Sequence, residues 1–184
     1  LERVQELSLL GLMIDALPAR VGSPLSLQSL RQDLQVSHDT IKRWLEITDN
    51  LYISFRLAPL GGEKIRAVKK EQKLYLWDWS VIKEKGPRFE NMVASHLLKY
   101  CHFIEDTEGW DMELRYFRDV DKREVDFVVL KNRTPIYFIE AKINDTQISD
   151  HLRYLKQRFP EVSTIQLCLE KDIDVSNEVG IRLC

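Results

Sequence analysis

Hydrophobic residues recur every three to four positions along residues 1–17, and Pro18 interrupts the pattern. This periodicity predicts an amphipathic helix that ends at the proline. The same spacing predicts a short helix over residues 26–34 and another helix after Ser37, a residue well suited to cap a helix N-terminus. Two short helices joined by a tight turn are typical of a helix-turn-helix.

Residues 51–57 and 73–78 are rich in β-branched, aromatic and other hydrophobic side chains, and Gly61 and Gly62 lie between them. This pattern predicts two strands that pair as a β-hairpin. A helix-turn-helix followed by a hairpin is a winged helix. We therefore expect a winged helix-turn-helix domain over residues 1–85.

Gly86 and Pro87 indicate a domain boundary, and residues 86–184 are expected to form a second domain. The predicted elements, in order, are a helix over 88–100, strands over 114–118, 124–129 and 137–142, a helix over 147–159, and strands over 164–169 and 181–183. Such an order is typical of an α/β (α+β) domain in which helices flank a mixed β-sheet.

The composition, 44% hydrophobic and 30% charged over 184 residues, is typical of a soluble globular protein. The three cysteines form no CxxC pair, which favours a reduced, cytoplasmic protein without a structural zinc site. No apolar run approaches the roughly 18 residues of a membrane span, so we expect no membrane association. Because Leu1 stands within the helical pattern and is not Met, we interpret the sequence as a piece of a longer protein.

The net charge of −2 gives no overall bias toward nucleic acid, but residues 55–73 are locally rich in Lys and Arg. Such a strip either binds phosphates or is simply a solvated hairpin. On the third predicted helix, basic side chains are placed to read a DNA groove, although Asp39 and Glu46 would repel phosphate. The expected DNA-binding residues are His38, Lys42, Arg43, Lys69, Lys70 and Lys73.

Charged residues interrupt two otherwise apolar predicted strands. Asp126 is expected to face away from Val125, Phe127 and Val129, and Glu140 to share a strand face with Lys142. Charged groups in such strands are costly to bury unless they are paired or hold a metal. If the strands are neighbours, the two carboxylates and the ammonium converge. This set of groups can bind a hard cation and cut a phosphodiester.

The second half resembles the PD-(D/E)XK nuclease-like superfamily, with Glu90 on the first helix, Asp126 on the second strand, and Glu140 and Lys142 in a Glu-x-Lys motif on the third. The whole chain resembles the C-terminal region of an AAA-type ATPase family of bacteria and archaea, through the winged helix and the runs Phe89-Glu90-Asn91, Tyr116-Phe117-Arg118, Glu124-Val125-Asp126-Phe127 and Ile139-Glu140-Ala141-Lys142. No GxxxxGK[ST] occurs, so the resemblance implies that ATP binds to a domain outside this chain.

The resemblance implies that Asp126, Glu140 and Glu90 hold Mg²⁺ or Mn²⁺ and that Lys142 orients the attacking water or stabilises developing charge. Glu124 is expected at the outer edge of the site. The predicted function is a metal-dependent DNA nuclease-like module attached to an ATPase domain. Three alternatives remain: a buried ion-paired cluster without catalysis, a non-catalytic module that binds DNA or protein for the ATPase, and a regulatory or oligomerisation domain.

Overall fold

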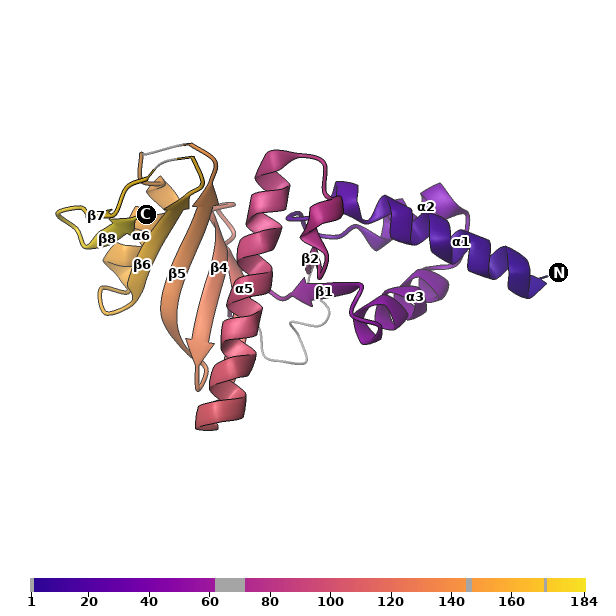
Figure 1. Cartoon of the computed structure of the whole chain (residues 1–184), viewed down its shortest axis with the longest axis horizontal. Helices are drawn as coiled ribbons and strands as arrows, with labels where there is room; N and C mark the ends of the chain where they lie inside the picture. Colours follow the sequence, from indigo (N-terminus) through magenta and orange to yellow (C-terminus); the bar gives the residue numbers. More distant parts are fainter. Residues whose placement is uncertain (1, 62–71, 145–146, 171) are drawn as a thin grey trace.

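The N-terminal part of the chain folds into helices that lead into a β-hairpin (Figure 1). The structure is a computed structural model and describes residues 2–61, 72–144, 147–170 and 172–184. Its first elements are α1 (Glu2–Ala16), the short 3₁₀ helix η1 (Pro18–Arg20), α2 (Leu27–Leu34) and α3 (His38–Asn50). The Ser37 hydroxyl caps α3 by accepting a hydrogen bond from the Thr40 amide, as the sequence predicts.

The hairpin consists of β1 (Ser54–Leu57) and β2 (Lys73–Leu76), which pair in antiparallel fashion. All residues of β2 are buried, because the strand has neighbours on both sides. On the side away from β1, the Gly22 amide donates to the Leu74 carbonyl at 3.1 Å. The hairpin strand is therefore an internal part of the molecule.

A 24-residue helix, α5 (Lys85–Glu108), follows the short 3₁₀ helix η2 (Trp79–Val81). It is longer than the helix predicted over 88–100, because the buried face continues through Cys101 and the helix ends at Gly109 in the left-handed conformation, with φ of 74°. Figure 1 shows α5 between the hairpin and the large sheet.

The second half of the chain is built on a mixed six-stranded sheet with the order β3-β4-β5-β6-β8-β7. Its strands are β3 (Met112–Arg118), β4 (Glu124–Lys131), β5 (Thr134–Lys142), β6 (Ser163–Cys168), β7 (Val175–Ser176) and β8 (Ile181–Leu183). The first three strands run antiparallel, and β5 and β6 pair in parallel after the crossover through α6 (Asp150–Arg158). The expected mixed α+β fold is confirmed.

Two hydrophobic clusters cover the two faces of this sheet. The first extends from the helices of the N-terminal part through the hairpin and α5 to β3, β4 and β5, and the rings of Tyr75 and Phe127 are 5.9 Å apart within it. The second lies between the sheet and α6. Within the described residues, no helix combines the length and the apolar character needed to cross a membrane.

Strand β4 contains a β-bulge next to Asp126. Arg115 of β3 pairs with Val128, whereas Phe117 pairs with Val125, so β4 has one residue more than β3 in this interval. A bulge interrupts the alternation of side chains between the two faces of a strand.

The bulge corrects one prediction about Asp126. Val125 packs in the second cluster, but Phe127 packs in the first. Asp126 and Phe127 both approach β2, because Asp126 lies 3.6 Å from the Lys73 ammonium and Phe127 contacts Tyr75. Asp126 thus faces away from Val125, as expected, but not from Phe127 or Val129, which also packs in the first cluster.

Candidate functional site

The acidic residues predicted to form a site come together where α5 approaches the bulged end of β4. Phe127 pairs with Ile139, which places Asp126 across from Glu140 on the neighbouring strand. The Asp126 Oδ2 atom accepts a hydrogen bond from the Ala141 amide at 3.0 Å, which fixes the carboxylate beside β5. Glu90 projects from the first turns of α5 toward the same cluster.

Glu140 and Lys142 lie on the same side of β5, and the Lys142 ammonium is 2.7 Å from Glu140 Oε1. Glu140 is only 4% exposed. Its second oxygen, Oε2, is buried and has no hydrogen-bond partner among the described residues. A buried carboxylate oxygen without a partner is costly, so this atom is an open acceptor position in the site.

Lys73, from the hairpin strand β2, inserts its ammonium among the carboxylates. Its Nζ atom is 2.7 Å from Glu124 Oε1, 3.5 Å from Glu90 Oε1 and 3.6 Å from Asp126 Oδ1. The residue is 1% exposed. This position corrects the prediction that Lys73 belongs to a DNA-binding basic strip, because a side chain so deeply buried cannot reach a phosphate on the surface.

Tyr75 and Gly22 also belong to the site, although the sequence analysis did not select them. The Tyr75 hydroxyl donates to Glu90 Oε1 at 2.7 Å. A Cβ atom on Gly22 would lie 2.9 Å from Glu90 Oε2, so the glycine leaves the room that this carboxylate occupies. The alternation of Lys73 and Tyr75 on one strand was a usable signal, because it places an ammonium and a hydroxyl on the same face.

Burial and mutual repulsion raise the pKa of two of the carboxylates. The pKa of Glu140 rises to about 7, mainly because the side chain is desolvated and then because Asp126 repels its charged form. The same two causes raise the pKa of Glu90 to about 7, although Lys73 and Tyr75 partly offset them. Additional positive charge at this cluster would therefore be stabilising.

The same carboxylates also raise the pKa of two groups on the hairpin, Lys73 and Tyr75. Burial alone would lower the pKa of the Lys73 ammonium, but the carboxylates of Glu90, Asp126 and Glu124 outweigh this effect and raise it. Burial and then Glu90 and Asp126 raise the pKa of the Tyr75 hydroxyl. Lys73 therefore stays positively charged and Tyr75 stays neutral across the physiological pH range.

The cluster has the ligand type that Mg²⁺ and Mn²⁺ prefer, since its acceptors are carboxylate oxygens. The best fit is at Asp126 and Glu140, where the open Oε2 atom lies. Across the part of the chain that the structure describes, no group of three or more His, Cys, Asp or Glu side chains could hold a metal as the side chains stand, with Lys73 among the carboxylates. Glu90, the expected third ligand, is instead engaged by Tyr75 and Lys73.

Comparison with known protein families gives two matches. Residues 85–180, more than half of the chain, match the profile described as Domain of unknown function (DUF4143). The chain belongs to the DUF4143 family. Residues 1–84 match a second profile, described as Domain of unknown function (DUF8612). No curated protein and no solved structure matches the chain.

The border between the two matches separates the residues of the acidic cluster. Lys73, Tyr75 and Gly22 lie in the DUF8612 segment, whereas the carboxylates belong to the DUF4143 segment. The cluster is therefore assembled from both segments. The DUF4143 segment taken alone would lack the Lys73 ammonium at the centre of the cluster.

The residues expected to read DNA on α3 have mixed surroundings. His38, Lys42 and Arg43 are exposed, as a DNA-reading face requires. Arg43 is 2.5 Å from Glu6 of α1, and Asp39 beside them is also fully exposed. Lys69 and Lys70 lie outside the described residues, so their role in DNA binding stays a prediction.

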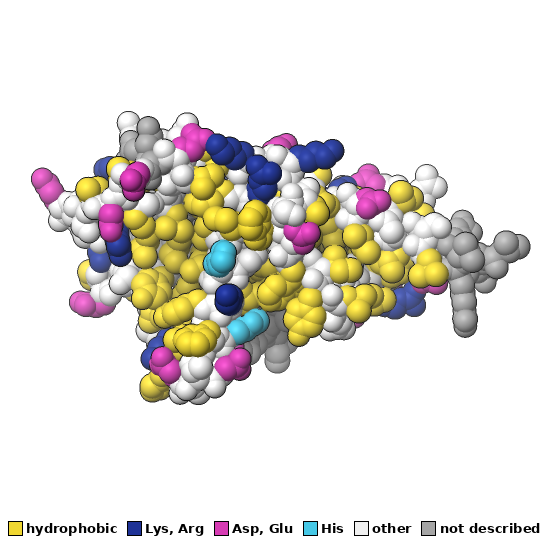
Figure 2. Space-filling view, in the orientation of Figure 1, with side chains coloured by type: hydrophobic (Ala, Val, Ile, Leu, Met, Phe, Trp, Pro, Cys, Tyr) yellow, Lys and Arg dark blue, Asp and Glu magenta, His cyan; other side chains and the backbone are white. Residues whose placement is uncertain are grey.

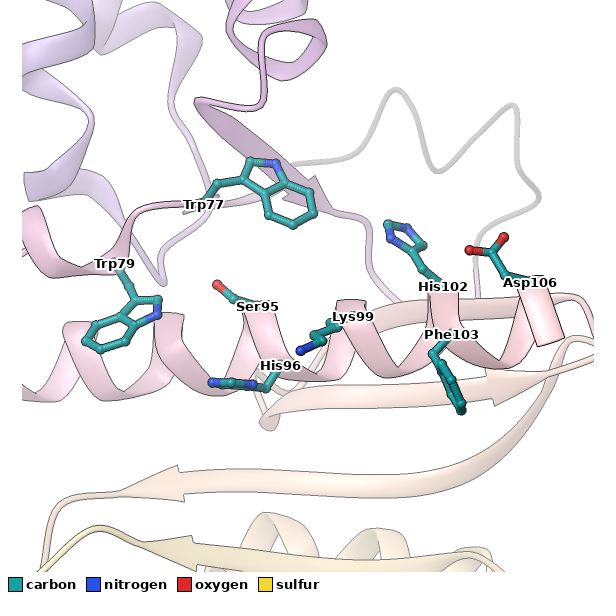
Figure 3. A pocket seen from close by; sticks show the side chains of 8 residues that line it. All are labelled: Trp77, Trp79, Ser95, His96, Lys99, His102, Phe103 and Asp106. Carbon is teal, nitrogen blue, oxygen red and sulfur yellow. The ribbon is translucent and has the colours of Figure 1, made fainter.

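A shallow groove of about 450 Å³ runs along α5 on the side of the tryptophans (Figure 3). Trp77 and Trp79 come from the segment after β2 and line the groove together with residues of α5 that include Lys99 and Phe103. Both tryptophans are partly buried against the first hydrophobic cluster, so they pack the hairpin segment against the following helix. The groove shares no residue with the acidic cluster.

Proposed function

We propose that this protein contains a metal-dependent phosphodiester-hydrolysing centre of the PD-(D/E)XK type, placed after a winged helix and acting on DNA. The observation that carries the proposal is the pair Asp126 and Glu140 on adjacent strands, with Lys142 beside Glu140 and with a buried Oε2 atom that lacks a partner. A structural ion-pair cluster would satisfy that oxygen with a donor.

In this proposal Asp126 and Glu140 hold a single Mg²⁺ or Mn²⁺ ion. A divalent ion in such a site polarises the scissile phosphate and lowers the pKa of water. Lys142, whose ammonium lies 2.7 Å from Glu140, stabilises negative charge that develops on the phosphate. Tyr75 and Lys73 bind the Glu90 carboxylate. In this proposal Glu90 is therefore not a metal ligand and contributes only its negative charge to the electrostatic potential of the site.

The resemblance to AAA-type ATPase proteins extends this proposal to a larger protein. The ATPase domain would supply ATP binding and the mechanical step, and the chain described here would supply contact with DNA. The arrangement of α2, α3 and the β1–β2 hairpin is consistent with a winged helix in that role.

The first test is calorimetric titration of Mn²⁺ into the wild type and into Asp126→Asn and Glu140→Gln, which keep side-chain size and remove the charge. We expect binding in the wild type and its loss in both variants, while Glu161→Gln, an exposed carboxylate outside the cluster, binds like the wild type. Cleavage of single-stranded, double-stranded and branched DNA should depend on the ion and on Lys142. Equal Mn²⁺ binding by all four proteins would refute the metal site.

A second candidate function is that of a non-catalytic module that binds DNA or a partner protein. It is favoured by the apolar surface that Figure 2 shows along α5 and the neighbouring elements. Large hydrophobic side chains of the protein are exposed, among them Tyr52 at 71% and Phe103 at 59%. Fluorescence anisotropy with labelled DNA at rising salt separates the two partners. DNA affinity must fall steeply with salt, because binding releases counterions.

A further inference from the structure

The acidic cluster already contains a cation of its own. Three carboxylates from two elements surround the Lys73 ammonium: Glu90 on α5, and Glu124 and Asp126 on β4, at 3.5, 2.7 and 3.6 Å. The side chain is 1% exposed, so water contributes little to its solvation. An ammonium has three N–H donors, and three acidic side chains are placed around it.

The carboxylates divide into two groups according to the cation that they face. Asp126 directs Oδ1 toward Lys73 and lies beside β5 through Oδ2, which the Ala141 amide holds. Glu140 contacts Lys142 and keeps one oxygen open. Asp126 thus lies between two parts of the cluster. Lys73 occupies one part, and the unpartnered Oε2 atom of Glu140 belongs to the other.

We propose that Lys73 is a built-in counter-ion that takes the place of a second divalent cation, so that the site binds one divalent ion at Asp126 and Glu140 and no more. The one-ion part of this inference rests on the proposed function, whereas the role of Lys73 rests on its own contacts. The hairpin of the N-terminal segment thereby sets the metal stoichiometry of the sheet domain.

The backbone that carries Lys73 is fixed on both sides of its strand. Strand β2 pairs with β1 on one side, and on the other the amides of Gly22 and Leu25 donate to Leu74 and Gln72 at 3.1 and 2.8 Å. The side chain of Asn91 bonds both the amide and the carbonyl of Leu76. These bonds fix the backbone of β2, so withdrawal of the ammonium requires a new side-chain rotamer for a residue that is only 1% exposed.

The test is the number of Mn²⁺ ions bound per chain, measured by calorimetry and by electron paramagnetic resonance of free Mn²⁺. The proteins are the wild type, Lys73→Met, which keeps a long apolar side chain without the charge, and Arg118→Met as the matched control. Arg118 also faces Glu124, but at 3.8 Å and from a side chain that is 36% exposed. We expect one ion in the wild type and in Arg118→Met, and two ions in Lys73→Met.

The possible results separate the two proposals. One ion in both the wild type and Lys73→Met, with equal affinity, overturns the role of Lys73 and leaves the metal site standing. No ion in the wild type but binding in Lys73→Met supports the role of Lys73 and overturns the one-ion site. No ion in either protein overturns both.

A measurement on the wild type keeps the inference testable if Lys73→Met does not fold. A buried, hydrogen-bonded ammonium exchanges its protons slowly enough to be observed in a ¹H–¹⁵N correlation spectrum selective for Lys Nζ. Titration with Mg²⁺, which is diamagnetic, should shift this signal and leave it visible at saturation. Its disappearance when Mg²⁺ binds would show that the ion displaces Lys73 and would overturn the inference.

Discussion

Glu140 carries the least satisfied charge of the cluster. Its side chain is 4% exposed, and its Oε2 atom has no hydrogen-bond partner in the part of the chain that is described. Desolvation and the nearby Asp126 raise its pKa from 4.5 to about 7. In the absence of metal, the folded protein therefore binds a proton at Glu140 more tightly than the unfolded chain does.

This difference predicts a pH dependence of stability. Because the folded-state pKa is raised, the stabilisation by the bound proton is complete below about pH 4.5 and is lost as the pH rises through about 7. We expect the free energy of unfolding of the metal-free protein to fall across this window in urea titrations. Glu140→Gln should reduce the slope, and the remainder should come from Glu90, whose pKa is raised to about 7 by the same causes.

Glu161→Gln serves as the control, since Glu161 is exposed and lies outside the cluster. Addition of Mn²⁺ should flatten the wild-type curve, because a bound divalent ion favours the charged carboxylates. A wild-type slope that Glu140→Gln does not change would contradict the assigned environment of this side chain.

Replacement of Gly22 by a residue with a side chain should lower the free energy of unfolding. The φ of Gly22 is +75°, and a Cβ atom would meet the Glu90 carboxylate at 2.9 Å. We expect Gly22→Ala to destabilise the protein by about 1–2 kcal/mol through the left-handed backbone alone, with an added cost from displacement of Glu90. Thermal unfolding measures this effect. Gly11→Ala is the comparison, because Gly11 lies inside α1 and nothing is within 4 Å of its added Cβ, so alanine should be neutral or stabilising there.

At the scale of elements, the Asn91 side chain on α5 forms hydrogen bonds with the backbone of β2, as a neighbouring strand would. Asn91 is fully buried; its Oδ1 atom accepts from the Leu76 amide at 2.8 Å, and its Nδ2 atom donates to the Leu76 carbonyl at 2.7 Å. The amide side chain thus satisfies both backbone groups at the end of the strand. It also fixes α5 relative to the hairpin that carries Lys73.

Asn91→Ala should destabilise the protein by about 2–4 kcal/mol, because two buried backbone groups lose their partners. Ser95→Ala is the matched control on the same helix, since the Ser95 hydroxyl donates to the Asn91 carbonyl at 2.9 Å and accepts only a long bond, 3.3 Å, from Asn91 Nδ2. We expect the control to change the free energy of unfolding by less than about 1 kcal/mol. Urea unfolding followed by circular dichroism measures both variants. Equal effects would contradict the bridging role of Asn91.

At the scale of the whole molecule, one hydrophobic cluster joins the DUF8612 and DUF4143 segments. It contains Met13 and Leu45 from the first segment, and Phe89, Phe127 and Ile139 from the second. The buried Lys73 adds an ionic connection across the same border. Neither segment therefore has a separate core on this side of the sheet.

This shared core predicts cooperative unfolding of the two segments. Trp44, Trp77 and Trp79 report mainly on the first segment by fluorescence, and circular dichroism reports on the whole chain. We expect the two urea curves to coincide, and we expect residues 86–184 alone to lack a sharp transition and to bind a hydrophobic dye. Two separate transitions, or a stable isolated fragment, would contradict the shared core.

The sequence alone determined the helices near the N-terminus, the hairpin, and the succession of most of the sheet strands along the chain, because these depend on periodicity and on local signals such as Ser37 and Pro18. It also selected Asp126, Glu140 and Lys142, since charges in apolar strands are conspicuous. The structure brings these residues together with Glu90, as expected, although Glu90 is held by other side chains.

Only the tertiary structure decided where Lys73 goes. Sequence reasoning placed it with the neighbouring basic residues on an exposed strip, because composition records the charge of a segment and not what packs over it. The bulge beside Asp126 and the room left by Gly22 also depend on partners far away in the chain. Periodicity tells which face of an element is buried, whereas the identity of the neighbour, and hence the chemistry of a buried charge, is set by long-range packing.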